Sequence, residues 1–395
     1  LLDDLNAVGL DPRLMALDAH PNIELRLYNP LRSREASLDR ALEMVQRVAS
    51  INHRMHNKAW IADGRVAIIG GRNIGEEYFA ADEEVNFRDL DLLLFGPAVA
   101  QASAIFDAFW NSPAVVPIAA LNRKSGDQLR RLLDRTDDDA LDAEARPYLE
   151  RVARADGVRA YQAQVLQPVW TDQVEIVSDP PLKGRGARKG WIVTRLVDVL
   201  RSARTQALVI SPYFVPGDTA VAAMSHLVEQ GVQVGVVTNS LAANDVPAVH
   251  GGYAAYRQPL LAAGVQLYET RLHGRPQAAG RIGSSGASLH TKAFVVDGRR
   301  GFVGSFNLDP RSADLNTEMG VLFDDPALGA AVRDEYLWLA EPEHSYWVYL
   351  SKEGDLRWLD WSRVPPEPHH TEPDASLGRR VLAKVLGWLP IESQL

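Results

Sequence analysis

The sequence predicts an α/β protein made of two related lobes, each an α/β/α sandwich built on a mixed sheet. The active site is expected at the interface of the lobes, where their motif loops meet. Three observations support this fold class. Strand-like and helix-like segments alternate along the chain, one set of polar residues occurs twice, and the segments around each copy follow the same order. The 395 residues are enough for two hydrophobic cores.

The repeated set consists of five residues on either side of the centre of the chain. His56, Lys58, Asp63, Gly70 and Asn73 recur 234 positions later as His290, Lys292, Asp297, Gly304 and Asn307. A constant offset over five matched residues indicates a duplicated structural unit.

The first copy, over residues 1–122, alternates helices and strands. Helices are predicted over 12–19, 37–49 and 99–110, and strands over 23–28, 55–61, 66–69 and 90–95. Asp63 and Gly64 supply the turn of a hairpin between the second and third of these strands.

The second copy, over residues 171–342, repeats this order and has additional elements ahead of it. Strands are predicted over 173–177, 207–214, 234–240, 289–296, 301–303 and 320–323, and helices over 191–203, 221–229 and 327–339. By the offset, residues 235–240 correspond to residues 1–6, and residue 1 is Leu rather than Met. We therefore expect the first lobe to lack about sixty residues at its N-terminus.

Two further segments complete the predicted organisation. Residues 123–170 are dense in charge and form an exposed helical connector, and residues 343–395 form a C-terminal extension. In the extension, apolar residues from Leu377 to Leu389 recur at helical spacing, beside Trp388 and the cations Arg379, Arg380 and Lys384. This helix either lies at a membrane interface or packs on the core of the protein itself.

Composition excludes several classes of function. No apolar run approaches the roughly 20 residues that cross a bilayer, so no membrane-spanning segment is expected in this chain. The absence of cysteine removes disulfides and thiolate chemistry. The net charge of −9 disfavours a broad nucleic-acid surface, and no nucleic-acid partner is expected.

The repeated residue types are suited to binding and attacking a phosphate. His and Lys at i and i+2 on a strand face the same way, and the small residues of the following turns let the backbone approach an anion. The predicted phosphate ligands are Lys58, Lys292, Asn73, Asn307, Gly71 and Ser305. No histidine or carboxylate stands at metal-ligand spacing near the motifs, so no metal or other cofactor is expected.

Two imidazoles fit a two-step displacement at phosphorus. One attacks and becomes a phosphohistidine, and the other is the general acid and then the general base. The residues alone do not assign the roles to His56 and His290. Glu318 is the candidate partner of His290, Asp89 takes the comparable place after the first motif, and Asp91 is a weaker alternative. Asp63 and Asp297 belong to the motif and are expected to organise the hairpins.

These residues resemble the twin motif of the phospholipase D superfamily, His-x-Lys-x4-Asp followed by Gly-Ser-x-Asn. More narrowly, the segments 55–58, 70–78, 211–216, 238–245 and 387–391 are similar to bacterial cardiolipin synthases, above all to their C-type branch. Gly71 departs from the superfamily pattern, which usually has Ser there, whereas Ser305 keeps it.

The resemblance implies a phosphatidyltransferase that carries a phosphatidyl group on histidine to phosphatidylglycerol and releases glycerol or ethanolamine. It also implies His56 as the nucleophile and His290 as the acid and base. The expected partners are phospholipids, namely phosphatidylglycerol and phosphatidylethanolamine, and a membrane surface. The expected location is peripheral, at the bacterial inner membrane.

Two alternatives remain open at this point. One is a phospholipase D-type phosphodiesterase that hydrolyses phospholipid or nucleic acid, and the other is a catalytically inactive membrane scaffold. The aromatic residues Tyr213, Phe214, Tyr253 and Tyr256 either line a groove for acyl chains or belong to the core. The phosphatidyl donor and the oligomeric state are left undetermined.

Overall fold

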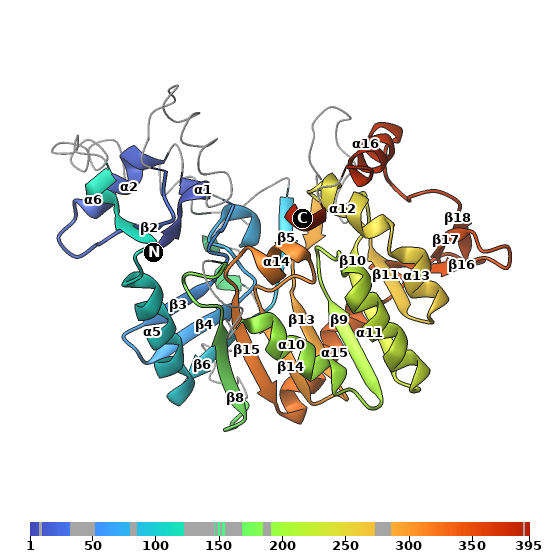
Figure 1. The fold of residues 1–395 in the computed structure, drawn as a ribbon, viewed down its shortest axis with the longest axis horizontal. Coiled ribbons are helices and arrows are strands. Elements are labelled where there is room, and N and C mark those ends of the chain that lie inside the picture. The colour runs from blue at the N-terminus through green and yellow to red at the C-terminus, as the bar shows by residue number, and fades with distance from the viewer. Residues whose placement is uncertain are drawn as a thin grey trace. The chain divides into compact units, whose positions relative to one another are not determined.

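The structure is a computed structural model of the chain. It describes residues 1–7, 10–31, 52–79, 85–121, 146, 149–150, 152–154, 168–184, 191–272, 286–389 and 392–395. The chain divides into two compact units, whose elements are labelled in Figure 1. The first comprises Leu1–His56, Ala104–Trp170 and Pro180–Ala187, and the second comprises Asn57–Ser103, Thr171–Asp179 and Arg188–Leu395.

The first unit contains a small three-stranded sheet. Its strands are β1 (Leu2–Asp3), β2 (Arg26–Tyr28) and β7 (Val115–Pro117), with β2 parallel to β1 and antiparallel to β7. The helices α1 (Asp4–Ala7), α2 (Asp11–Asp18) and α6 (Ile118–Leu121) lie around it. Leu14 and Met15 of α2 pack with Leu27 and Ile118 in its core. The predicted helix over 12–19 is confirmed, whereas the helix over 37–49 lies outside the described residues.

A ten-stranded mixed sheet is the centre of the second unit (Figure 1). In spatial order its strands are β18 (Glu367–His369), β17 (Leu356–Asp360), β16 (Ser345–Leu350), β11 (Gln266–Thr270), β10 (Gln233–Asn239), β9 (Gln206–Ile210), β13 (Ala293–Val296), β14 (Arg300–Gly304), β15 (Met319–Asp324) and β8 (Val174–Ser178). The neighbours β9, β10 and β11 run parallel, and the other pairs are antiparallel. The strands predicted for the second copy are therefore confirmed with shifted ends, except the single strand predicted over 289–296, which the structure divides into two.

Helices cover both faces of this sheet. They are α10 (Ile192–Arg201), α11 (Gly217–Glu229), α12 (Pro247–Ala254), α13 (Arg257–Ala262), α14 (Pro310–Asp314), α15 (Pro326–Leu339), α16 (Leu377–Gly387) and the 3-10 turn η2 (Glu392–Gln394). Val209 of β9 packs with the helices α10 to α13, whereas its neighbour Leu208 packs with α15. Alternate residues of a strand point to opposite faces, so the unit is an α/β/α sandwich, as predicted.

The second unit also contains two smaller sheets. One has the order β3 (Ala59–Ala62), β4 (Val66–Gly70) and β6 (Asp91–Phe95), and the other pairs β5 (Val85–Arg88) with β12 (Gly286–Leu289). The turn η1 (Glu76–Tyr78) follows β4, and α5 (Pro97–Trp110) follows β6. Leu92 of β6 packs against the core beneath the large sheet.

The two motif hairpins pair their strands identically. Ala59 pairs with Ile69 as Ala293 pairs with Val303, and every pair between these strands keeps the offset of 234. The turns also match, because Asp63 and Asp297 have φ of 53° and 52° and the glycines after them have φ of 62° and 65°. Positive φ at both central residues is the conformation that tight hairpins require.

The compact units do not follow the predicted boundaries at residues 122, 170 and 342. Residues 57–103, from the first sequence copy, belong to the second unit because β4 and β6 pack against β14 and β15. The predicted extension 343–395 is integral too, because β16 pairs with β11 and adds three strands to the large sheet. Most of the predicted connector 123–170 lies outside the described residues.

No helix in the described part of the chain is both long enough and apolar enough to cross a membrane.

Candidate active site

The second motif lies between two sheets and not on a strand. The apolar segment predicted as one strand over 289–296 divides into β12 and β13, and His290, Thr291 and Lys292 connect them. The His290 backbone N–H donates to the Arg88 carbonyl at 2.8 Å, which fixes the loop to β5. The prediction of two side chains on one strand face is therefore wrong here, because the chain leaves one sheet and enters another at the motif.

A carboxylate from the first sequence copy holds the His290 ring. Nδ1 of His290 lies 2.6 Å from Oδ2 of Asp89, and both side chains are buried. A hydrogen bond to one ring nitrogen sets which nitrogen faces the reactant, so Nε2 is the reactive atom. The predicted pairing of Glu318 with His290 is wrong, because Asp89 fills that role.

Asp89 and Glu318 nevertheless occupy equivalent positions. Gly70 of β4 pairs with Asp91, and Asp89 lies two positions before Asp91. In the same way, Gly304 of β14 pairs with Gly320, and Glu318 lies two positions before Gly320. Glu318 Oε2 accepts a hydrogen bond from Ser305 Oγ at 2.5 Å. Asp91, the weaker alternative, instead binds Arg72, whose Nε lies 2.7 Å from Asp91 Oδ2.

Burial and nearby cations shift the pKa of Asp89 in opposite directions. Burial raises its pKa, and the charges of Lys292, Arg72 and Lys58 oppose that rise together with the Leu90 N–H group. Both motif lysines therefore lie within electrostatic range of the His290–Asp89 pair. The charges of lysines from both sequence copies therefore act on the same carboxylate.

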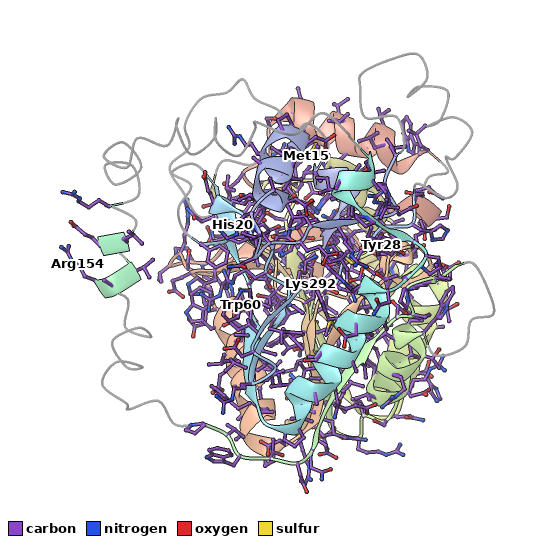
Figure 2. The ribbon with its side chains drawn as sticks, turned by 90° about the vertical axis from the view of Figure 1, so that its left-hand side faces the viewer. Met15, His20, Tyr28, Trp60, Arg154 and Lys292 are labelled. Atoms are coloured by element: carbon purple, nitrogen blue, oxygen red, sulfur yellow. The ribbon has the colours of Figure 1, made fainter. Side chains whose placement is uncertain are left out.

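Lys292 is a buried ammonium group. Its side chain is only 1% exposed (Figure 2), and Nζ donates to the carbonyl of His290. Burial lowers its pKa to about 8 against the opposing charges of Asp89 and Glu318. A lysine with a pKa this close to neutrality can lose its charge within an ordinary assay range.

The asymmetry between Gly71 and Ser305 has a steric cause. A Cβ atom on Gly71 would lie 2.3 Å from Oδ1 of Asp89, far inside van der Waals contact. The equivalent Ser305 has room for its side chain and uses it to bind Glu318. Glycine at position 71 is therefore required by the carboxylate that orients His290.

The two motif asparagines have different surroundings. Asn73 Nδ2 donates to the Tyr78 hydroxyl at 2.7 Å. Asn307 is 4% exposed, and in the described residues its carboxamide oxygen is buried with no hydrogen-bond partner. A buried polar atom without a partner costs about 1–3 kcal/mol, which makes the Asn307 carboxamide a candidate contact for a ligand.

The motif aspartates lie in the hairpin turns, at the opposite end of the strands from the histidine. Oδ1 of Asp297 accepts from the backbone N–H groups of Thr205 and Gln206 at 2.8 and 3.0 Å. Asp63 occupies the same turn position in the first hairpin. Both aspartates thus lie in the hairpin turns, and the Asp297 carboxylate connects its turn to the segment ahead of β9.

The first-motif histidine is at the edge of the other unit. His56 is half-buried and ends the first of the three segments that make up the first unit, whereas Lys58 belongs to the second unit. The facing arrangement of His56 and His290 therefore stays a prediction.

Sequence reasoning missed the aromatic surroundings of His290. The Tyr78 hydroxyl lies 3.4 Å from His290 Nε2, and burial raises the pKa of this phenol, so it stays protonated. The Tyr213 ring meets the imidazole edge-on with centroids 6.4 Å apart, and its hydroxyl donates to Asp245 at 2.8 Å. Tyr78, Tyr213 and Asp245 all lie in the segments that carried the family resemblance, which was the available signal.

Of the two interpretations of the aromatic residues, the structure supports the core for three of the four. Phe214, Tyr253 and Tyr256 are buried in the main core cluster of the second unit. An apolar cavity of about 260 Å³ lies elsewhere, lined by Ala293, Phe306 and residues of α10 and α14. Its lining includes the chain neighbours of Lys292 and Asn307, but none of the predicted site residues.

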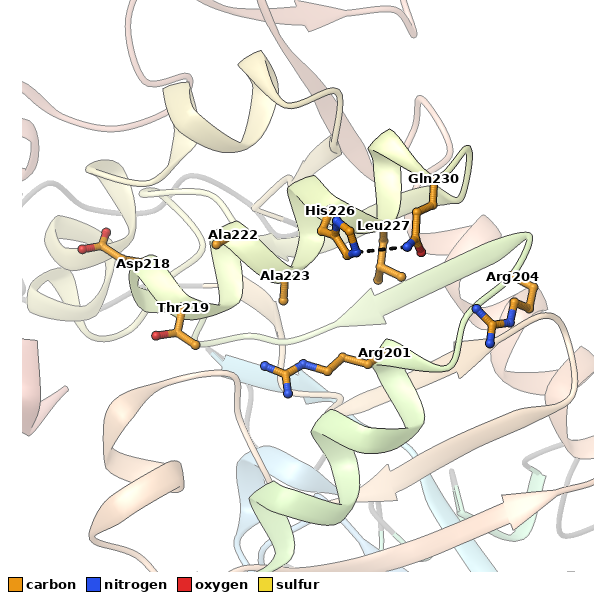
Figure 3. Close-up of a pocket in the computed structure, with 9 residues that line it drawn as sticks. All are labelled: Arg201, Arg204, Asp218, Thr219, Ala222, Ala223, His226, Leu227 and Gln230. Atoms are coloured by element: carbon orange, nitrogen blue, oxygen red, sulfur yellow. Dashed lines mark hydrogen bonds between the residues drawn. The ribbon is translucent and has the colours of Figure 1, made fainter.

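A second hollow has no link to the motifs. It measures about 720 Å³ and lies between the end of α10 and α11, with Arg201, Arg204 and His226 in its lining (Figure 3). None of the predicted site residues lines it. Among the described residues, no group of three or more His, Asp or Glu side chains is arranged to hold a metal ion.

Several known proteins are similar to this chain. Cardiolipin synthase C of Escherichia coli (strain K12) is 37% identical over 406 residues, which cover 99% of this chain and 83% of the relative. Cardiolipin synthase A of Edwardsiella ictaluri (strain 93-146) is 33% identical over 184 residues, or 46% of this chain and 33% of the relative.

The fold has a solved counterpart as well. The crystal structure of phosphatidylserine synthase from Haemophilus influenzae Rd KW20 matches with a TM-score of 0.54 and 16% identity, over 87% of this chain and 71% of that chain. A family model described as cardiolipin synthase, PLD-like domain, matches residues 196–339. The resemblance predicted from the motifs is thus confirmed, and the chain belongs to the cardiolipin synthase family of phospholipase D-like enzymes.

Proposed function

We propose that this protein transfers a phosphatidyl group from one phospholipid to the free glycerol hydroxyl of phosphatidylglycerol, through a phosphohistidine. The observation that carries the proposal is the buried His290–Asp89 pair with Lys292 beside it, in a chain 37% identical to a cardiolipin synthase. An imidazole braced by a carboxylate and flanked by ammonium groups is suited to proton transfer next to a phosphate.

In the first half-reaction, His56 attacks phosphorus while the bond from phosphorus to the headgroup oxygen breaks. Protonated His290 gives its proton to that oxygen, so glycerol leaves from phosphatidylglycerol, or ethanolamine from phosphatidylethanolamine. Asp89 stabilises the imidazolium form of His290 that this step requires.

In the second half-reaction, His290 takes the proton from the hydroxyl of a phosphatidylglycerol molecule. The hydroxyl oxygen attacks phosphorus, and the bond from phosphorus to His56 breaks. Lys58, Lys292 and the protonated phenol of Tyr78 stabilise the negative charge on the phosphoryl oxygens. The phosphate ligands predicted from the motif turns, Asn73 and Asn307, complete this set.

The lipid nature of both substrates determines where the reaction takes place. Phospholipids reside in a bilayer, so the protein acts peripherally at the bacterial inner membrane. The chain's net charge of −9 disfavours a nucleic-acid substrate.

Product analysis with phosphatidylglycerol vesicles tests the proposal. Cardiolipin and free glycerol in equal amounts are expected. Phosphatidic acid without cardiolipin would establish hydrolysis in place of transfer, and the absence of any product would support an inactive scaffold.

Labelling with substrate that carries radioactive phosphorus tests the histidine roles. We expect His290→Ala to lose turnover yet retain label on the protein, whereas His56→Ala takes up none. His226→Ala, at a largely exposed histidine of α11, is the matched control and should behave as wild type. Equal labelling of the His56 and His290 variants would overturn the assignment.

A further inference from the structure

The C-terminal helix α16 buries Ala383 and exposes most of its large apolar residues. Ala383 is 5% exposed, and a Cβ on Gly251 of α12 would lie 2.5 Å from the Ala383 carbonyl. Two helices can approach this closely only where both contact surfaces are small. The contact between α12 and α16 therefore fixes which side of α16 faces the protein.

The opposite side of the helix is apolar and faces solvent. Leu377 and Trp388 are 76% and 74% exposed, and Val381, Leu382, Val385 and Leu389 are exposed as well. Residues 377, 381, 385 and 388 lie on one face at helical spacing, and Ala383 and Gly387 lie on the other. The helix does dock on the protein, through Ala383, but its large apolar residues do not contribute to that contact. The helix is well formed nonetheless, since Ser376 caps it by accepting from the Arg379 N–H.

Cations flank the exposed apolar face. Lys384 lies 5.8 Å from the ring of Trp388, which suits a tryptophan at the boundary between headgroups and acyl chains. Arg379 and Arg380 lie towards the protein and donate to carbonyls, including that of Leu241 at 2.7 Å. This local positive charge contrasts with the chain's net charge of −9, so it complements an anionic surface.

The helix is braced to the segment that supports the candidate active site. Arg379 donates to the carbonyls of Leu241 and Asn244, and Ser288, two residues before His290, donates to the Ala243 carbonyl at 2.7 Å. The same segment ends at Asp245, which binds Tyr213 beside the imidazole. A surface bound to α16 is thus connected to His290 through residues 241–245.

We infer that the exposed face of α16 is a docking surface for an anionic phospholipid bilayer. An apolar helix face with a flanking tryptophan and cations binds at the interface of such membranes. The inference rests on the proposed function for its biological purpose, because a bilayer holds both proposed substrates. Docking would bring the helix adjoining the site into the headgroup layer.

Co-sedimentation of the full chain with phosphatidylglycerol and phosphatidylcholine vesicles tests the inference. Glutamate at both Val381 and Val385 should weaken binding to phosphatidylglycerol vesicles about tenfold or more. Leu337→Glu, at an exposed leucine of α15, is the matched control and should bind as wild type. Lys384→Gln should weaken binding to anionic vesicles only.

Activity on a short-chain phosphatidylglycerol dissolved as monomers separates docking from chemistry. The α16 double variant should retain wild-type turnover there and lose it on vesicles. Unchanged vesicle binding by the double variant would overturn the docking role. Unchanged binding together with loss of a dimer in sedimentation would instead assign the face to a second copy. Wild-type binding without cardiolipin formation would refute only the proposed function.

Discussion

The hairpin β3–β4 of the first motif and the hairpin β13–β14 of the second pair their strands in the same register, but their surroundings differ. Trp60 and Ile68 pair across the first and are 55% and 38% exposed. Their counterparts at the offset of 234, Phe294 and Phe302, pair across the second and are almost fully buried. The first hairpin belongs to a three-stranded sheet, and the second lies inside the ten-stranded sheet.

This difference shows which properties a local sequence controls. The turn residues and the alternation of side chains are enough to form the same hairpin in either environment. Burial depends on neighbouring strands and helices, such as β9, which pairs with β13. The same motif can therefore contribute an exposed edge in one copy and a core strand in the other.

The largest expected effect is on stability at the paired positions. Phe294→Ala should lower the free energy of unfolding by about 3–5 kcal/mol, because it leaves a cavity in the core. Trp60→Ala, at the equivalent exposed position, should cost less than about 1 kcal/mol. Urea unfolding measures both, and similar losses would contradict the contrast in burial.

Adding a side chain at Gly71, where the second motif has Ser305, should impair catalysis. Gly71→Ala pushes Asp89 away from His290, and a displacement near 1 Å costs about a hundredfold in turnover. Gly378→Ala is the control, since a Cβ there would meet nothing within 4 Å. A Gly71→Ala variant with wild-type kcat would show that the Asp89 contact does not matter for the reaction.

The pH dependence should distinguish the two motif lysines. Lys292 carries its charge below its pKa of about 8 and loses it above, so kcat should fall about tenfold per pH unit on the alkaline side. Lys292→Arg keeps its charge at high pH and should abolish this fall in whatever activity remains. If Lys58→Arg instead abolishes the alkaline fall in kcat, the titrating group is Lys58 and not Lys292.

The smallest expected effect concerns the turn aspartates. Burial acts to raise the pKa of Asp297, but hydrogen bonds from Thr205, Gln206 and Arg204 outweigh it, and the pKa is lowered. Asp297→Asn should therefore cost about 1 kcal/mol at pH 7, whereas Asp63→Asn should cost almost nothing. The pKa of Asp297 is lower in the folded protein than in the unfolded chain, so its contribution to stability is complete above the unfolded pKa and is lost as the pH falls below it. The effect of Asp297→Asn should therefore fade below about pH 4. Thermal unfolding against pH measures this, and a constant difference would contradict it.

Much of the site was predictable because the motif is local in sequence. The repeated residues marked the lysines, the asparagines and the hairpin aspartates as candidates, and the turn signals located the two hairpins. The pairing of His290 was not predictable, because Glu318 and Asp89 are equivalent by position. Only the packing of β4 and β6 on the large sheet brings Asp89 to that ring.

The sequence by itself determined the residue types of the motif, the hairpin register and the family, because each depends on residue types at fixed short spacings. Tertiary structure alone decided which carboxylate braces His290, why residue 71 is glycine and which face of α16 is exposed. Those outcomes depend on contacts between segments far apart in the chain. Van der Waals exclusion and burial act between such segments, and no local pattern encodes them.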